Sequence, residues 1–249
     1  MYLFYTSVLY KCNPKHNYMK TMKKSILFLA TASFIITHLT SCKKEDSKDV
    51  NQDKIYAEYE LLYDKNQDKT YASAVFKFSN VLGTNLQLSS PSEVKFGSDV
   101  IPYDATFAYY RKEYAGQINS GTFTFKDTDG KLYTNSVTLA KSITNPVIDT
   151  IKRTGAYTYT WIGDSVATKE VVGLTIGSNA TPTNFQFFLQ AAVSAKNLVL
   201  PLNQLNQLSI GQSWAQLDRQ IETTTGNFGS AGGKLRGKYR AQNKNFYVK

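Results

Sequence analysis

Hydrophobic and polar residues alternate with a period of two along most of the chain after residue 54. In the first stretch, the apolar side is formed by Ile55, Ala57, Tyr59, Leu61 and Tyr63. Successive side chains of a β-strand point to opposite faces, so this alternation predicts a half-buried strand. The same pattern predicts further strands around 72–78, 123–125 and 133–139.

Short polar segments separate these strands. Residues 66–68 (Asn-Gln-Asp) and 127–130 (Asp-Thr-Asp-Gly) have the composition of hairpin turns, and Gly130 can adopt the positive φ that such turns need. Residues 64–68 also match the first half of an EF-hand loop. The glycine and glutamate that complete such a loop are replaced by Lys69 and Val75, so we expect a turn without calcium.

A second series of strands is predicted after Asn145-Pro146, where proline removes a hydrogen-bond donor and interrupts the pattern. Its segments are 156–162, 166–176, 185–195, 198–200, 213–223, 234–242 and 246–248. In the third segment the apolar set is Phe185, Phe187, Leu189, Ala191 and Val193. The spacing of three leucines predicts one helical turn at Leu202, Leu205 and Leu208. The pattern contains no amphipathic helix of ordinary length.

These segments predict an all-β protein. Several short strands at this spacing are typical of a β-sandwich or barrel. The interruption at Asn145-Pro146 divides them into two sets, each near the size of one immunoglobulin-like sandwich. We therefore expect two tandem β-sandwich domains, over 54–143 and 144–249. A single sandwich or barrel of about 200 residues is the alternative.

The N-terminal part of the chain has the pattern of an export signal. Lys23 and Lys24 precede an apolar run over 26–36, and small or hydroxylic residues then lead to Cys42. Secretory signals have a basic start and about 7–15 apolar residues, whereas a membrane-spanning helix needs about 20. We therefore expect residues 1–41, an upstream extension plus a signal peptide, to be removed. Translation could begin at Met1, Met19 or Met22.

The quartet Leu39-Thr40-Ser41-Cys42 resembles the lipobox of bacterial lipoproteins. This resemblance implies lipidation of Cys42 and attachment to the outer membrane through two or more acyl chains. The next residues, 43–46, resemble the tether of surface-exposed lipoproteins of Bacteroidota, and the polar stretch 42–53 is expected to be flexible. With its strand pattern, the chain resembles Bacteroidota lipoproteins that carry tandem immunoglobulin-like domains of uncharacterised function.

Cleavage before Cys42 would restrict the available chemistry. His16, His38 and Cys12 all precede Cys42, and the chain has no other histidine or cysteine. A mature chain without histidine or a free thiol lacks Ser-His and Cys-His nucleophiles and His- or Cys-ligated metal sites. We therefore expect no enzyme, cofactor or metal; a hydrolase that uses two carboxylates is the least favoured alternative. Five of the 29 Lys and Arg precede Cys42 but none of the 19 Asp and Glu, so the formal charge falls from +10 to +5.

The remaining positive charge is concentrated near the C-terminus in what we call the basic row. Its members are Lys234, Arg236, Lys238 and Arg240. Alternation places all four on one face of a strand, about 6.6–6.8 Å apart. They are a candidate binding site for anionic lipid or polysaccharide. In the competing interpretation they form a solvated face, balanced across the sheet by Asp218 or Glu222.

The densest group of aromatic residues lies between 103 and 114. Tyr109, Tyr110 and Tyr114 are candidates for stacking on sugar rings or for contact with a protein. The competing interpretation is that they fill the core between sheets or domains. Trp161 and Trp214 are expected to anchor the core.

Taken together, these features predict a lipid-anchored, non-catalytic module of the cell envelope that recognises a glycan or a protein. The alternative is an envelope-structural protein that binds anionic lipid or polysaccharide through the basic row. Nucleic acid is not an expected partner, because few aromatic residues interleave with the basic row.

Overall fold

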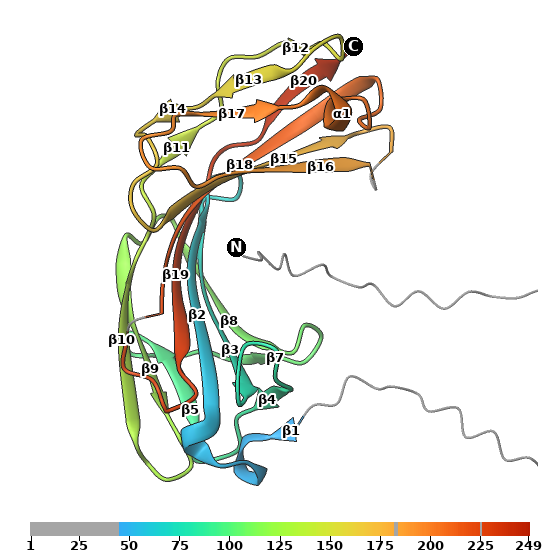
Figure 1. Ribbon diagram of the computed structural model, residues 1–249. Helices are drawn as coiled ribbons and strands as arrows, with labels where there is room; N and C mark the ends of the chain where they lie inside the picture. Colours follow the sequence, from blue (N-terminus) through green and yellow to red (C-terminus); the bar gives the residue numbers. More distant parts are fainter. Residues whose placement is uncertain (1–44, 182–183, 225) are drawn as a thin grey trace, which may run out of the picture. The chain divides into compact units, whose positions relative to one another are not determined.

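The computed structural model describes residues 45–181, 184–224 and 226–249 (Figure 1). Cys42 and the predicted signal peptide lie outside these residues. The described part is all-β, as predicted, and its one α-helix is the four-residue α1 (Leu202–Leu205) at the predicted leucine turn. None of the described helices has the length and apolar character that crossing a membrane would require.

The largest sheet contains twelve strands. They are β1 (Glu45–Asp46), β2 (Ile55–Asp64), β3 (Lys69–Phe78), β4 (Asn85–Gln87), β7 (Tyr103–Asp104), β8 (Tyr109–Ala115), β12 (Thr150–Ile151), β15 (Glu170–Ser178), β16 (Phe185–Gln190), β18 (Gly211–Thr223), β19 (Gly233–Arg240) and β20 (Lys244–Val248). The order of the main path is β1-β4-β3-β2-β19-β18-β15-β16. The first and last strands of this path are therefore separated by six others.

Three smaller sheets complete the described part. One has four strands, β5 (Glu93–Phe96), β6 (Asp99–Val100), β9 (Ser120–Lys126) and β10 (Leu132–Thr138). The other two are pairs, β11 (Ile143–Thr144) with β14 (Ile162–Gly163), and β13 (Tyr157–Thr160) with β17 (Asn197–Leu200). Two short 3₁₀ helices, η1 (Ser47–Asp49) and η2 (Gln52–Lys54), precede β2.

The predicted boundary between residues 143 and 144 does not separate two sheets. Strand β19 from the predicted second half pairs in parallel with β2 from the first, over 233–240 and 57–64, and pairs on its other edge with β18. Buried hydrophobic residues of both halves belong to one cluster, and the described residues form one compact unit. The tandem immunoglobulin-like domains and the alternative of a single sandwich or barrel both stay predictions. The periodicity of a strand identifies the strand but not its neighbour.

The segment expected to be a flexible tether, 42–53, is folded wherever it is described. Glu45 and Asp46 form β1, which pairs with β4. Ser47 is completely buried, and its Oγ accepts a hydrogen bond of 2.9 Å from the Ser89 amide. The Gln52 side chain donates to the Ser47 carbonyl at 2.6 Å. The buried Ser47 and Gln52 thus bond to the backbone, while the other described polar residues of the segment are exposed or half-buried.

The predicted turns agree with the structure. Residues 65–68 join β2 to β3, and residues 127–131 join β9 to β10 with Gly130 at a φ of +81°. The apolar face of β2 packs as the alternation requires: the Tyr59 ring stacks on Phe123 of β9 with ring centroids 4.9 Å apart. Stacked aromatic pairs of this kind add about 0.5–1.5 kcal/mol beyond the burial of their area.

Trp161 anchors the core as predicted. Its ring is 1 % exposed, and its Nε1 donates to the Asp164 carbonyl at 2.9 Å. The guanidinium of Arg219, which is fully buried, also donates to this carbonyl and lies 3.9 Å from the Glu170 carboxylate. Removing one partner of such a buried pair leaves an uncompensated charge, which costs about 3–5 kcal/mol. We therefore assign Arg219 and Glu170 to the stability of the fold.

Candidate functional site

The basic row lies on the central strand β19, between β2 and β18 (Figure 1). The four side chains do share one face, as predicted, and each is only 20–28 % exposed. Each also has a carboxylate partner on a neighbouring strand. The ion pairs are Lys234–Glu222 at 3.3 Å, Arg236–Glu60 and Arg236–Glu222 at 2.9 Å each, Lys238–Asp218 at 3.2 Å, Arg240–Asp218 at 2.9 Å and Arg240–Asp64 at 3.5 Å.

The electrostatics of these pairs favour charged carboxylates. Burial by itself would raise the pKa of Glu60, but the adjacent Arg236 and Lys238 hold that pKa below its ordinary value. The pKa of Asp218 is likewise lowered, because Lys238 and Arg240 outweigh the effect of burial. Both carboxylates therefore remain ionised near neutral pH and neutralise the row.

The balancing role predicted for Asp218 and Glu222 is therefore confirmed. Two further partners, Glu60 and Asp64, come from β2 and were not predicted, because nothing in the sequence shows that β2 lies beside β19. A cation held by one or two carboxylates has little charge left for an external anion. The basic row is consequently a weak candidate for binding anionic lipid or polysaccharide.

Strand β8 divides the predicted tyrosine cluster between its two faces. Tyr110 is buried against Phe76, with ring centroids 5.6 Å apart, and Tyr114 packs against Phe96 at 5.7 Å. Burial raises the pKa of both phenols to about 12. These two rings belong to the core, as the competing interpretation predicted.

Tyr109 lies on the opposite, outer face of β8, where its hydroxyl accepts a hydrogen bond of 3.2 Å from Arg111. Its ring is in contact with Phe107, with centroids 5.9 Å apart. One partly exposed tyrosine remains of the proposed three-residue stacking site. The predicted site is therefore not assembled as a unit.

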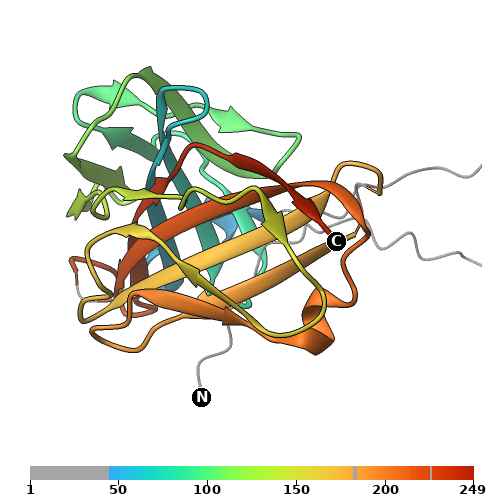
Figure 2. The same ribbon diagram turned by 90° about the horizontal axis from the view of Figure 1, so that it is seen from above.

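A different set of apolar residues faces solvent at the other end of the sheet. The strand predicted over 185–195 is observed as β16 over 185–190 only, and its apolar side is the exposed side: Phe185 is 55 %, Phe187 38 % and Leu189 41 % exposed. The next strand residue on the inner side, Phe188, is 5 % exposed. We call Phe185, Phe187, Leu189 and Trp214 the apolar platform. Figure 2 shows the three strands that bear it, β16, β15 and β18, side by side.

Two glycines of β15 allow the platform rings to lie close to the sheet. A Cβ atom on Gly177 would be 2.3 Å from Cζ2 of Trp214, so the indole covers the backbone of Gly177. A Cβ on Gly173 would be 3.4 Å from Cε2 of Phe187. Neither glycine has a positive φ. At Gly177 the missing side chain, not backbone freedom, makes room for the indole, whereas a Cβ at Gly173 would be in ordinary van der Waals contact with Phe187.

The register places two of the platform residues, Phe185 and Trp214, in one row across the strands. Phe185 pairs with Gly177, Gly177 with Trp214, and Trp214 with Asn245 of β20. Phe185 and Trp214 are two strand spacings apart, or about 9.6 Å. Trp214 is half-buried on the outer face, so the expectation that it anchors the core was wrong. Paired residues of a sheet lie on the same face. Because Trp214 pairs with Gly177, which is on the outer face of β15, Trp214 is on the outer face as well.

A small hollow with both polar and apolar lining borders this row. It has a volume of about 190 Å³ and is lined by Asp149, Gln212, Asn245, Phe246 and Tyr247. Gln212 pairs with Tyr247, and its side chain and the 53 % exposed Tyr247 ring lie at the edge of the platform. Amide and phenol groups both donate and accept hydrogen bonds. Flat apolar rings beside such groups suit a ligand with apolar faces and hydroxyl edges.

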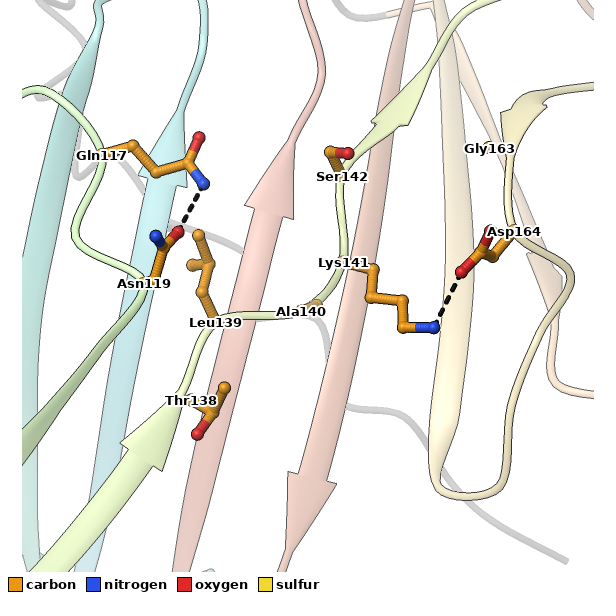
Figure 3. Close-up of a pocket in the computed structure, with 9 residues that line it drawn as sticks. All are labelled: Gln117, Asn119, Thr138, Leu139, Ala140, Lys141, Ser142, Gly163 and Asp164. Atoms are coloured by element: carbon orange, nitrogen blue, oxygen red, sulfur yellow. Dashed lines mark hydrogen bonds and ion pairs between the residues drawn. The ribbon is translucent and has the colours of Figure 1, made fainter.

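The larger hollow of the described residues has a different character. It measures about 360 Å³ and is lined by residues 117, 119, 138–142 and 163–164. Figure 3 shows Lys141 reaching toward Asp164, with which it forms an ion pair of 2.7 Å, and Gln117 donating to Asn119 at 2.7 Å. Its polar side chains bind one another. We find no reactive or ligand-binding arrangement there.

No cluster of three or more His, Cys, Asp or Glu suitable for a metal ion occurs among the described residues. The half EF-hand forms the β2–β3 turn instead, where Asp64 Oδ1 accepts hydrogen bonds from the Asn66 backbone at 2.9 Å and side chain at 2.8 Å. Comparison of the chain with known protein families and with curated proteins gives no match.

Proposed function

We propose that the chain is a lipid-anchored, non-catalytic module of a bacterial cell envelope that binds a neutral glycan on the apolar platform. The observation that carries the proposal is the Trp214 ring, which lies over Gly177 on the same sheet face as the exposed Phe187. Anchoring at Cys42 rests on its resemblance to a lipobox. No step of this proposal requires a catalytic group.

The chemistry of the platform supports a sugar as the ligand. Pyranose rings have apolar C–H faces that stack on aromatic rings, and hydroxyls at their edges that need hydrogen-bond partners. The platform offers aromatic rings for stacking. Gln212, Asn245 and Asp149 offer hydrogen-bond partners for the hydroxyls. Phe185, Phe187 and Leu189 are exposed along β16, which suits a chain of sugars.

The charge distribution supports a neutral ligand. The nearest members of the basic row on the same face, Arg240 and Lys238, are both paired with Asp218. An anionic polysaccharide would have to compete with these internal carboxylates. A neutral glycan pays no such penalty, because its contacts are apolar or uncharged.

The proposal is tested by calorimetric titration of the mature protein with hexasaccharides of β-1,4-linked glucose, xylose and mannose, and with a sulfated hexasaccharide. We expect binding of a neutral hexasaccharide and a change in Trp214 fluorescence. Phe187→Ala should weaken binding about tenfold, because a lost aromatic contact is worth about 1–2 kcal/mol. Added salt should leave the affinity unchanged.

The matched control is Lys238→Gln, which removes a cation from the basic row and leaves the platform intact. We expect this variant to bind the neutral hexasaccharide as the unmodified protein does. If only the sulfated hexasaccharide binds, with an affinity that falls with salt and with Lys238→Gln, the platform proposal is wrong and the alternative based on the basic row is supported.

A further inference from the structure

The loop between β3 and β4 presents hydrophobic side chains to solvent. Val81 is 43 % and Leu82 76 % exposed, and Phe78 at the end of β3 is 37 % exposed. We call residues 78–83 the apolar loop. Single exposed apolar residues are ordinary on protein surfaces, whereas three on one tight loop form a local apolar projection.

The apolar loop is held in one conformation by its own hydrogen bonds. The Leu82 amide donates to Asn80 Oδ1 at 2.9 Å, and the Gly83 amide donates to the Asn80 carbonyl at 2.9 Å. A Cβ on Gly83 would lie 1.7 Å from the Phe78 carbonyl oxygen, so this close turn requires glycine. The exposed side chains are therefore positioned before any partner binds, which lowers the entropy lost on contact.

The direction of β1 shows from which side the described chain approaches this loop. Strand β1 pairs in parallel with β4, with Glu45 opposite Leu86. Parallel strands begin at the same end, and the start of β4 is where the apolar loop joins it. The chain therefore enters β1 from the loop's end of the strand pair. Cys42 precedes Glu45 by three residues, and three residues span at most about 11 Å.

We propose that the apolar loop inserts into the surface of the membrane that holds the acyl chains of Cys42. This inference rests on the anchoring part of the proposed function. The short reach from Cys42 to Glu45 keeps the folded body close to the lipid. Exposed apolar side chains at that height gain by entering the boundary between headgroups and acyl chains.

The charges and the topology around the loop fit this contact. The adjoining segment 45–54 carries four acidic residues, Glu45, Asp46, Asp49 and Asp53, and two lysines, Lys48 and Lys54, so this segment has no excess of cations for anionic headgroups. The contact should therefore depend little on salt. Strand β1 is first and β16 last in the sheet order, so a membrane contact beside β1 leaves the platform on β16 free for a ligand.

The test uses the full mature, lipidated chain with Leu82→Cys, labelled with an environment-sensitive fluorophore and bound to vesicles of phosphatidylethanolamine and phosphatidylglycerol. With Cys12 removed and Cys42 acylated, the introduced thiol is the one that reacts. We expect a blue shift and quenching by lipids brominated on their acyl chains. The matched control is Val147→Cys, whose position is 86 % exposed and which we expect to remain in water.

A second variant, Val81→Ser with Leu82→Ser, should transfer between vesicles about tenfold faster, because the apolar area it would bury is smaller. A lipidated chain whose label at position 82 is as water-exposed as that at 147 would overturn the inference alone. A chain that mass spectrometry finds unacylated at Cys42 would overturn both the inference and the proposed anchoring. Glycan binding, measured with Phe187→Ala, is independent of both outcomes.

Discussion

The basic row and the apolar platform lie on the same face of one sheet, yet their side chains have opposite relations to their surroundings. Asp218 of β18 lies between the two regions. It forms an ion pair with Arg240 of β19 on one side and lies opposite Gly173 of β15 on the other. On the β19 side every cation has a carboxylate partner. On the β15 and β16 side, Phe185 and Leu189 face solvent over a glycine-containing strand.

This difference shows at which of the two regions a ligand would gain more binding free energy. A charge that is already paired inside the protein gains little from a new partner, because the existing pair must be disrupted or shared. An exposed aromatic ring loses only its contact with water when a ligand covers it. The conspicuous charges of the sequence therefore serve the fold, and the less conspicuous phenylalanines are free to bind.

The largest expected effect is on stability, from Arg236→Ala. This change leaves Glu60 and Glu222 opposite each other without their shared cation. Breaking a fully buried pair costs about 3–5 kcal/mol; with the side chain 28 % exposed, we expect about 2 kcal/mol. Urea denaturation measures it. Lys131→Ala, which removes a 61 % exposed cation 3.9 Å from Asp53, should change the stability much less, because exposed ion pairs are screened by water.

Acid should weaken the same region without affecting the platform. Glu60 and Asp218 have pKa values held below their ordinary 4.5 and 3.8 by the neighbouring cations. Groups with a lowered pKa stabilise the fold above those ordinary values, and this contribution is lost as the pH falls through the lower pKa of the folded state. The temperature of thermal unfolding should thus be constant from pH 7 to about 5 and fall below about pH 4.5. A fall in the unfolding temperature that is already complete at pH 5 would contradict the ion pairing of Glu60 and Asp218.

Gly177→Ala should weaken glycan binding with a smaller effect on stability than Arg236→Ala. The new methyl group would lie 2.3 Å from Trp214, so the ring must tilt away from the sheet. We expect an affinity about tenfold lower and a shifted Trp214 emission, measured by titration and fluorescence. Gly155→Ala is the matched control, because a Cβ there meets nothing within 4 Å. Equal affinities for the two variants would contradict the role of the ring.

The smallest expected effect is that of Asn245→Ala beside the platform. One neutral hydrogen bond contributes about 0.5–1.5 kcal/mol, so we expect the glycan affinity to fall about fivefold. Gln117→Ala removes an amide from the hollow of Figure 3 and should leave the affinity unchanged. Calorimetric titration of both variants compares the two hollows directly. A loss of affinity in Gln117→Ala instead would place the ligand away from the platform.

The strands and turns were accessible to sequence reasoning because their signals are local. The alternation over 55–63 predicted β2, the Asp-Thr-Asp-Gly segment predicted the turn at Gly130, and three leucines predicted α1. The platform was missed although its signal was present. Gly173 and Gly177, four residues apart on β15, mark the two places where a ring could lie against the strand, but they indicate this only once β16 and β18 are known to flank it.

By itself, the sequence determined that the protein is all-β, where most strands and turns lie, and that β19 has four cations on one face. Only the tertiary structure decided that β2 lies beside β19 and supplies Glu60 and Asp64, that β1 is folded against β4, and that the apolar side of β16 faces outward. The physical reason is the separation along the chain over which each interaction acts. Alternation and turn chemistry act between neighbours in the chain, whereas Arg236 and Glu60 are 176 residues apart and meet only when the whole sheet has formed.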